Sequence, residues 1–237
     1  MQEKPTTPPP GKPTDSFRHG HRDRLRQRLR TAGPTAVQDH ELLELVLFRA
    51  IPRRDVKVLA HQLIKHFGDI SAVMAADPQE LKKFSGIGDR VVDEFLTIRA
   101  AALRFGQSKI INRQIMAGWD DLIFYCRTKM AEEKIESFHV LFLDKKNKLI
   151  ADEKMGHGTV DHTPVYPREV IKRALELDAT ALIIAHNHPS GDPQPSKADI
   201  EMTHKLKQLT GAFNIVLHDH LVVARGEVLS FKEKGLL

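Results

Sequence analysis

Two histidines and an aspartate near the end of the chain have the residue types and the spacing of a metal site. His186 and His188 stand two apart at the end of an apolar segment, and Asp199 follows a loop rich in proline and glycine. Side chains two apart on an extended segment point to the same side. Two imidazoles and one carboxylate form a three-ligand set for zinc that leaves the fourth position open to water. The sequence therefore predicts one Zn²⁺ per chain.

A His-x-His pair alone is weak evidence, because the chain contains three of them. The pair His19/His21 lies in a polar N-terminal segment and is interpreted as solvated. The pair His218/His220 flanks Asp219 and is interpreted as structural or as a neighbour of the metal ligands. Only the middle pair ends an apolar strand, enters a rigid loop and meets a Ser-x-x-Asp sequence.

The elements that must position these ligands are strands and helices in alternation. A short, fully apolar run at 181–185 is typical of a central strand, and a proline opens the helix before it. Turn residues around 144–147 join two strands into a hairpin. We expect an α/β sandwich on a mixed sheet, with helices at 119–130, 167–177 and 196–209 and strands at 138–144, 148–155, 181–185, 215–217 and 221–224.

The N-terminal half has a different pattern. Residues 1–20 are rich in proline and predict a disordered tail. Residues 21–107 repeat apolar side chains at helical spacing without a strand pattern, and predict an all-helical domain. A linker is expected at 107–114. The helices are expected at 21–30, 42–47, 56–67, 70–75, 78–84 and 89–105.

The metal-site sequence resembles that of a known family. His186-x-His188, with Ser196 three residues before Asp199, resembles the JAMM (MPN+) metalloprotease motif, and the longer string HNHPSG…PS..D resembles the RadC family. The strand-turn-strand LFLDKKNKLI and the later Pro167-Arg-Glu support this resemblance. It implies that residues 115–237 form a JAMM-type zinc domain, a cytidine-deaminase-like α/β sandwich.

The resemblance also implies roles for individual residues. His186, His188 and Asp199 match the zinc ligands, and Ser196 matches the serine that hydrogen-bonds the reacting oxygen. A glutamate upstream should act as general base on the zinc-bound water, and Glu153 occupies the matching place.

Other interpretations of these residues stay open. Ser196 and Asp199 also fit a helix N-cap with an acidic residue in the first turn. Glu153 also fits a solvated carboxylate on a strand, and the sequence offers further candidates for the base that it favours less: Asp152, Glu133 and Glu136. The segment after the hairpin could supply neighbours of the ligands from His157, Asp161 or His162.

A second motif, Ser85-Gly86-Ile87-Gly88, resembles the hairpin of helix-hairpin-helix domains. There, glycines let backbone N–H groups approach a phosphate at a helix N-terminus. Lys83 and Arg90 would favour a phosphate beside Gly86 and Gly88. A turn that only packs two helices together is an equal alternative.

Charge and composition narrow the function further. The net charge is +5, and residues 1–30 hold eight basic and three acidic residues, so the rest of the chain is neutral. The basic segment at 21–30 predicts a solvated, charge-rich first helix, and an arm that contacts the phosphates of DNA is the alternative. No apolar run predicts a membrane span or a secretory signal. Cys126 is the single cysteine, which excludes a disulfide framework and favours the cytoplasm.

The sequence also excludes several zinc chemistries. His-Glu-x-x-His is absent, and one cysteine cannot form a nucleobase-deaminase site. The resemblance to the JAMM and RadC families implies a zinc-dependent hydrolase of the metallopeptidase or isopeptidase kind, acting on an unidentified protein or peptide. The alternative is a DNA-binding protein of DNA repair or recombination, in which the metal site is a nuclease centre or a scaffold.

Overall fold

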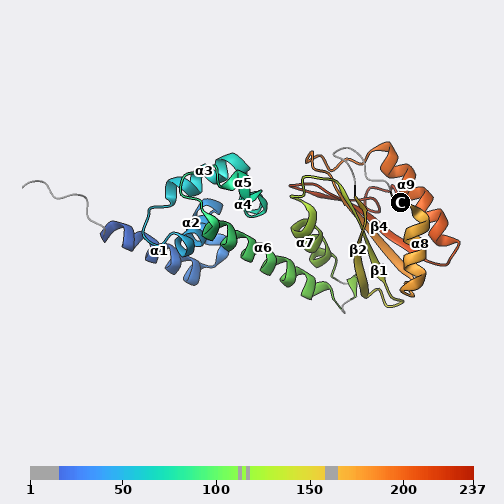
Figure 1. The fold of residues 1–237 in the computed structure, drawn as a ribbon. Helices are drawn as coiled ribbons and strands as arrows, with labels where there is room; N and C mark the ends of the chain where they lie inside the picture. The colour runs from blue at the N-terminus through green and yellow to red at the C-terminus, as the bar shows by residue number, and fades with distance from the viewer. Residues whose placement is uncertain (1–15, 112–113, 116–117, 158–164) are drawn as a thin grey trace, which may run out of the picture. The chain divides into compact units, whose positions relative to one another are not determined.

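The structure is a computed structural model, shown in Figure 1, that describes residues 16–111, 114–115, 118–157 and 165–237. The chain folds into two compact units, Met1–Leu96 and Thr97–Leu237, each with most of its contacts within itself. The division falls inside a long helix, and each unit has its own hydrophobic core.

The described residues of the first unit are helical, as predicted. Gly68, at a φ of 104°, ends one helix, and the carboxylates of Asp69 and Asp77 cap the next two by accepting hydrogen bonds from backbone N–H groups. Leu43, Leu47 and other fully buried side chains fill the space between the helices. The elements are α1 (Ser16–Ala32), the 3₁₀ turn η1 (Pro34–Ala36), α2 (Asp39–Ala50), α3 (Lys57–Phe67), α4 (Ile70–Ala75), α5 (Pro78–Leu81) and the start of α6 (Asp89–Ile110).

Two boundaries in the helical part differ from the prediction. Helix α1 begins at Ser16, so residues 16–20 are helical rather than part of the tail, and residues 1–15 lie outside the described residues. The last proline of the tail is Pro13, so nothing in 16–20 interrupts a helix. Helix α6 runs on to Ile110 through part of the expected linker, because that stretch also lacks a proline.

The second unit contains a mixed five-stranded sheet in the order β2-β1-β3-β4-β5. Strands β3 and β4 pair in parallel, and all other neighbours pair antiparallel. This confirms the predicted mixed sheet. The elements are α7 (Trp119–Met130), β1 (Ser137–Leu143), β2 (Leu149–His157), α8 (Pro167–Glu176), β3 (Ala181–Asn187), α9 (Lys197–Gly211), β4 (Val216–Val223) and β5 (Val228–Ser230).

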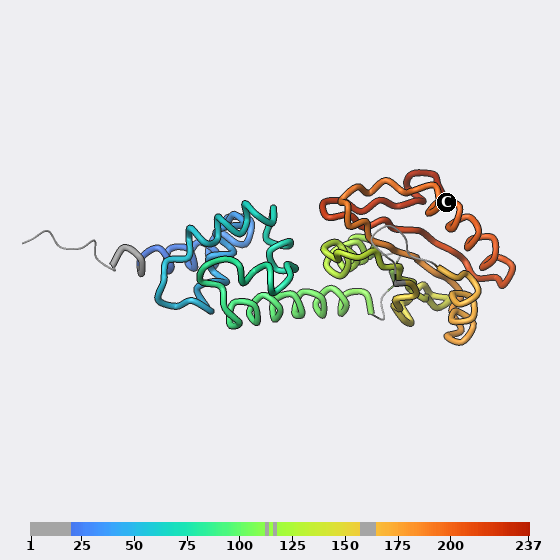
Figure 2. Tube along the Cα trace, turned by 45° about the horizontal axis from the view of Figure 1, so that its top comes forward, coloured from blue at the N-terminus to red at the C-terminus, as the bar shows by residue number. Residues whose placement is uncertain are grey.

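Helix α7 covers one face of the sheet, and helices α8 and α9 cover the other (Figures 1 and 2). Successive side chains of a strand point to opposite faces of the sheet, so alternate residues of the central strands pack into two different cores. On β3, Ile183 packs in the core under α7, whereas Ile184 packs in the core under α8 and α9. We call these the α7 face and the α8/α9 face.

The prediction of two short strands at 215–217 and 221–224 is wrong. One strand, β4, runs through the polar stretch between them, and β5 was not predicted. The polar stretch can be buried because its groups have partners. The Asp219 carboxylate accepts hydrogen bonds from Ser230 Oγ and from the N–H groups of His220 and Lys232.

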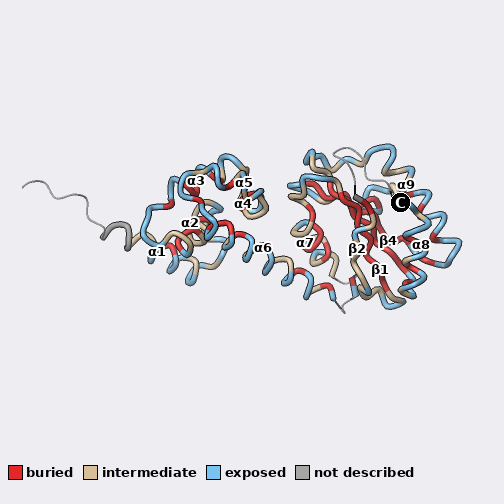
Figure 3. Tube along the Cα trace, viewed as in Figure 1, coloured by how far each residue is buried: buried red, intermediate tan, exposed pale blue. Residues whose placement is uncertain are grey.

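Burial is concentrated on the central strands, as Figure 3 shows. Every residue of β1 and β3 is buried. His186, near the end of β3, is therefore held on a rigid strand. Among the described residues, no helix is long and apolar enough to cross a membrane.

Candidate metal centre

Strand β3 and helix α9 bring the three predicted ligands together. His186 lies near the end of β3, and the His188 N–H continues the pairing with β4 by donating to the Val223 carbonyl at 2.9 Å. Gly191, at a φ of 85°, then helps the chain turn back. Ser196 caps the start of α9 and places Asp199 in its first turn.

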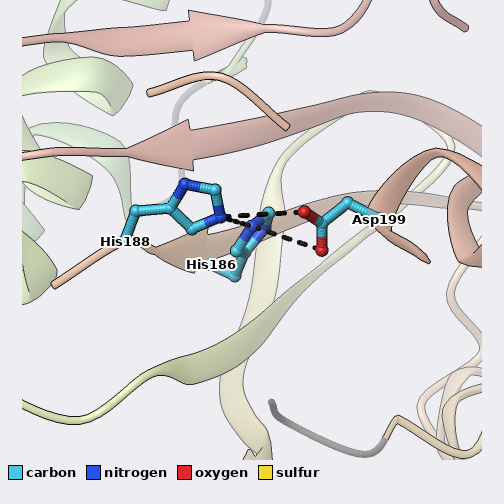
Figure 4. A group of neighbouring side chains, drawn as sticks. All are labelled: His186, His188 and Asp199. Carbon is cyan, nitrogen blue, oxygen red and sulfur yellow. Dashed lines mark hydrogen bonds and ion pairs between the residues drawn. The ribbon is translucent and has the colours of Figure 1, made fainter. Parts of the chain in front are cut away.

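The ligand atoms of these residues face one another (Figure 4). His186 Nε2 lies 2.9 Å from His188 Nε2, and the Asp199 oxygens lie 3.6 Å and 3.7 Å from these nitrogens. All three ligand atoms lie within 4.8 Å of one another, and no other such group of three is found among the described residues. His186 is buried, and the other two are partly buried.

The hydrogen bonds behind His186 determine which of its nitrogens carries the proton. The Asp199 carbonyl can only accept, so the Thr203 hydroxyl donates to it at 2.6 Å. That hydroxyl then accepts from His220 Nδ1 at 2.6 Å, and His220 Nε2 accepts from His186 Nδ1 at 2.7 Å. With Nδ1 protonated, a neutral His186 presents a lone pair at Nε2.

A single hydrogen bond indicates which nitrogen of His188 carries the proton. Its Nδ1 lies 2.7 Å from the Asp192 carbonyl, which can only accept, so Nδ1 carries the proton. Two Nε2 lone pairs and a carboxylate therefore meet at one point. Such an arrangement repels itself unless a cation is shared between the three groups, and it is the donor set that zinc prefers. The residues present thus fit a metal ion.

The electrostatics of the cluster agree with this arrangement. Burial lowers the pKa of His186 to about 4 and holds the pKa of His220 well below its usual value, which favours the neutral form of both rings. Burial would raise the pKa of Asp199, but its interactions with His188, His186 and Ser196 hold that pKa well below its usual value. The same interaction with Asp199 raises the pKa of His188. A carboxylate and a basic nitrogen are thus available at one point.

Ser196 acts as the helix cap that the sequence allowed. Its hydroxyl accepts from the Asp199 N–H at 3.1 Å and donates to Asp199 Oδ2 at 2.6 Å, while its own N–H donates to the same oxygen at 2.7 Å. This reciprocal capping box fixes the carboxylate. The side chain is exposed, and its predicted contact with a reacting oxygen stays a prediction.

Glu153 is engaged elsewhere on the α8/α9 face. Arg173 of α8 donates three hydrogen bonds to its two carboxylate oxygens, at 2.6 to 3.0 Å. Such a bidentate pair is strong and occupies the lone pairs that a base would use. The structure therefore gives no geometric support to Glu153 as the general base, and that assignment stays a prediction.

Glu136, one of the candidates that the sequence favoured less, lies closer to the cluster. Strands β1 and β3 pair antiparallel with Phe138 opposite His186. Continuing this register by two residues brings Glu136 level with His188. The charge of Glu136 adds to the dominant effect of Asp199 in raising the pKa of His188.

The buried amide of Asn187, between the two histidines, fixes the segment that carries Glu136. Its Oδ1 accepts from both the N–H and the hydroxyl of Ser137, and its Nδ2 donates to the carbonyls of Glu133 and Ile135. All four hydrogen-bonding positions of the amide are used. The sequence contained a usable signal, because a residue just before a strand antiparallel to β3 must lie beside the end of β3.

The remaining site predictions have mixed outcomes. Asp161 and His162 lie outside the described residues, and His157 ends β2. His218 Nε2 bonds Asn147 Oδ1 at 2.7 Å in the hairpin turn, which is a structural role, whereas His220 contacts a ligand.

The residues of the predicted DNA contact form a turn before α6. Gly86 has a φ of 99°, and the Gly88 carbonyl accepts the N–H of Val91 at 3.0 Å. Lys83 pairs with Glu80, and Arg90 is exposed. The structure shows a turn here, and both the helix-hairpin-helix assignment and the phosphate contact stay predictions.

The basic segment 21–30 is partly used within the fold. Arg22 donates to the carbonyls of Ile51 and Arg54 at 3.1 Å and 2.6 Å, and it lies over the Phe48 ring. Arg28 pairs with Glu41. These guanidinium groups stabilise the helical unit, which reduces the charge that the segment offers to DNA.

Comparison with known proteins covers both units. The family described as RadC-like JAB domain matches residues 116–236, and the family described as UPF0758 N-terminal matches residues 19–91. A UPF0758 protein of Rhodobacter capsulatus is 54% identical over 213 residues, which is 90% of this chain and 100% of the relative. A UPF0758 protein of Ruegeria pomeroyi is 50% identical over 222 residues, which is 94% of this chain and 99% of the relative.

Proposed function

Because the chain belongs to the RadC family, which joins a UPF0758 N-terminal domain to a RadC-like JAB domain, we propose that it is a zinc-dependent hydrolase of amide bonds in proteins or peptides. JAB-type domains typically bind a metal. The observation that carries the proposal is the convergence of the Nε2 atoms of His186 and His188 and the Asp199 carboxylate on one point.

His186, His188 and Asp199 would hold the ion. Zinc bound by such a set supplies a Lewis acid for a carbonyl oxygen and a water of lowered pKa. We assign Glu136 as the general base that accepts the proton of the attacking water and passes it to the leaving amine. The exposed Ser196 hydroxyl, which donates to Asp199 Oδ2, would turn this proton toward the oxygen of the attacked carbonyl when substrate is bound.

The test begins with metal content. Mass spectrometry of the untagged full-length protein should find one zinc per chain in the wild type and none in the His188→Ala variant. A wild type that contains no metal and takes up none from added zinc would overturn the proposal.

Activity is then measured on a mixture of synthetic peptides and isopeptide-linked conjugates, with new termini detected by mass spectrometry. We expect Glu136→Gln to retain zinc and to lose a factor of roughly 10² to 10⁴ in cleavage rate. Glu153→Gln is the matched control, and it should cleave nearly as fast as the wild type. The reverse result would return the base to Glu153. Cleavage that persists in His188→Ala would come from a contaminant.

The DNA-binding alternative is tested in parallel on labelled duplex and branched DNA. Cleavage of DNA by the zinc-loaded wild type, with no amide hydrolysis, would favour a nuclease centre over our proposal. Binding without cleavage, weakened in Arg90→Glu, would assign the hairpin to DNA and leave the amide hydrolase to be judged on its own assay.

A further inference from the structure

We propose that Thr203 and His220 form a hydrogen-bond relay that holds the His186 ring in its metal-binding orientation, a role that rests on the zinc centre proposed above. The relay runs from the Asp199 carbonyl through Thr203 Oγ1 and the His220 ring to His186 Nδ1. Thr203 and His220 are thus positioning residues, which act on the metal through His186.

Because both rings are buried, the hydrogen bonds of this relay satisfy ring nitrogens that water does not reach. Thr203 and His220 are fully buried, and His186 is 1% exposed. Water cannot replace a lost partner there without opening the core. Breaking any link would leave an imidazole N–H or lone pair unsatisfied, so the His186 ring would turn or take the other tautomer. In the other tautomer Nε2 carries a proton and cannot bind a metal.

Aromatic packing fixes the middle of the relay. The His220 ring is stacked on Phe231, with centroids 4.4 Å apart and planes inclined by 28°. Phe138 meets the same ring edge-on at 5.9 Å. This packing holds the His220 ring where one nitrogen bonds His186 and the other bonds Thr203.

Asp199 ties both ends of this system together. Its carboxylate faces Nε2 of His186, and its own carbonyl begins the relay that ends on Nδ1 of the same ring. A loose relay would consequently disturb two of the three ligands at once, His186 through its ring and Asp199 through its backbone. Partners of ligand histidines have this effect in general, and their loss weakens metal affinity by about 10- to 100-fold.

Helix α9 offers a matched control. Thr203 and Thr210 are both fully buried threonines of this helix. The Thr210 hydroxyl donates to the Lys207 carbonyl at 3.2 Å, whereas the Thr203 hydroxyl reaches His220. Replacing either by valine removes one buried hydroxyl and keeps the shape of the side chain, so the two variants differ in the relay alone.

The experiment measures zinc affinity of full-length proteins by competition with a chromophoric chelator. Thr203→Val should bind zinc about 10- to 100-fold more weakly than the wild type. Thr203→Ser, which keeps the hydroxyl, should restore affinity to within about threefold, and Thr210→Val should match the wild type. Thr203→Val binding as tightly as Thr210→Val would overturn the relay while leaving the zinc centre intact. Absence of zinc binding in the wild type would overturn both.

A second measurement needs no variant, in case Thr203→Val does not fold. Long-range ¹H–¹⁵N NMR spectra of the metal-free wild type distinguish the two imidazole tautomers. We expect His186 and His220 to be protonated at Nδ1. A proton on Nε2 of His186 would contradict the relay.

Discussion

The two faces of the sheet each hold a histidine beside an aspartate, but among the described residues only the cluster on the α8/α9 face has a donor set that could hold a metal. On the α8/α9 face, the ion pairs of Asp199 among the described residues run to His186 and His188 alone. On the α7 face, Asp152 accepts from Tyr125 at 2.6 Å, from Lys129 at 2.7 Å and from His139 at 3.1 Å.

The difference lies in where the cation comes from. The Lys129 ammonium forms an ion pair with Asp152 at 2.7 Å, so the cluster on the α7 face is neutralised by its own side chains. Burial would raise the pKa of Asp152, but the hydrogen bonds from His139, Lys129 and Tyr125 lower it to about 2. In the part of the chain that the structure describes, no lysine or arginine pairs with Asp199 on the α8/α9 face, so a proton or a metal ion would supply the positive charge there. Histidine and aspartate together therefore do not predict a metal site unless the local positive charges are counted.

The largest expected effect separates the two histidines. His188→Ala removes one of three ligands and should weaken zinc binding by more than about 100-fold, because even the loss of an outer partner costs 10- to 100-fold. His139→Ala should bind zinc as the wild type does and should instead lose about 2 to 4 kcal/mol of stability from the buried gap and the broken contact. Chelator competition and urea unfolding of the metal-free proteins measure the two quantities.

The result for His139→Ala tests whether the two faces are independent. If His139→Ala lost zinc as His188→Ala does, the two faces would be coupled, and the α7 face could not be described as self-contained. The Glu153→Gln protein serves as the control, since it changes a charge on the metal-site face without removing a ligand.

Next in size is the loss of the carboxylate on the α7 face. Asp152→Asn leaves the Lys129 ammonium, which is 25% exposed, without its anion and should cost about 2 to 4 kcal/mol. The pKa of Asp152 is lower in the folded protein than in the unfolded chain, so the unfolded chain binds more protons as the pH falls. The contribution of Asp152 is complete above about pH 5 and is lost between about pH 4 and pH 2.

Urea unfolding at several pH values checks this sign. The wild type should lose more stability than Asp152→Asn on going from pH 5 to pH 3, so the two curves should converge in acid. Parallel curves would show that Asp152 does not titrate in the folded protein as its partners require.

The sequence predicted most of the architecture because hydrophobic periodicity is a local property. The apolar run of β3, the turn at 144–147 and the proline that begins α8 each act through neighbours in the chain. The strand β4 was predicted as two pieces because its polar stretch is buried by partners far along the chain, among them Ser230.

The proposed ligands and the proposed base, Glu136, also differ in how far a local sequence pattern predicts their positions. His186, His188 and Asp199 lie close together in the chain around one turn, so their spacing indicates their convergence. Glu136 is brought to the site only by the pairing of β1 with β3, which no local pattern encodes. The family resemblance suggested Glu153 as the general base. Its pairing with Arg173 could not be predicted in the same way, because it depends on how α8 packs across the sheet.

A smaller effect is expected for the neutral partner of Asp152. Tyr125→Phe removes one hydroxyl donor and leaves Lys129 and His139 in place, so it should cost about 1 to 2 kcal/mol without changing zinc affinity. Thermal unfolding against Asp152→Asn gives the comparison. A loss as large as that of Asp152→Asn would mean that the hydroxyl, rather than the ammonium, holds the cluster together.

The smallest perturbation uses the single cysteine as a reporter of the α7 face. Burial, with the nearby charge of Asp152, raises the pKa of the Cys126 thiol from 9.0 to about 12. The thiolate is the reactive form, so a shift of this size should slow labelling by a maleimide about 1,000-fold at pH 8 relative to the urea-unfolded chain. Asp152→Asn should label faster, because the opposing negative charge is gone and α7 is held less firmly. His188→Ala, on the other face, should label at the wild-type rate. Equal acceleration in both variants would show that the two faces open together as one unit.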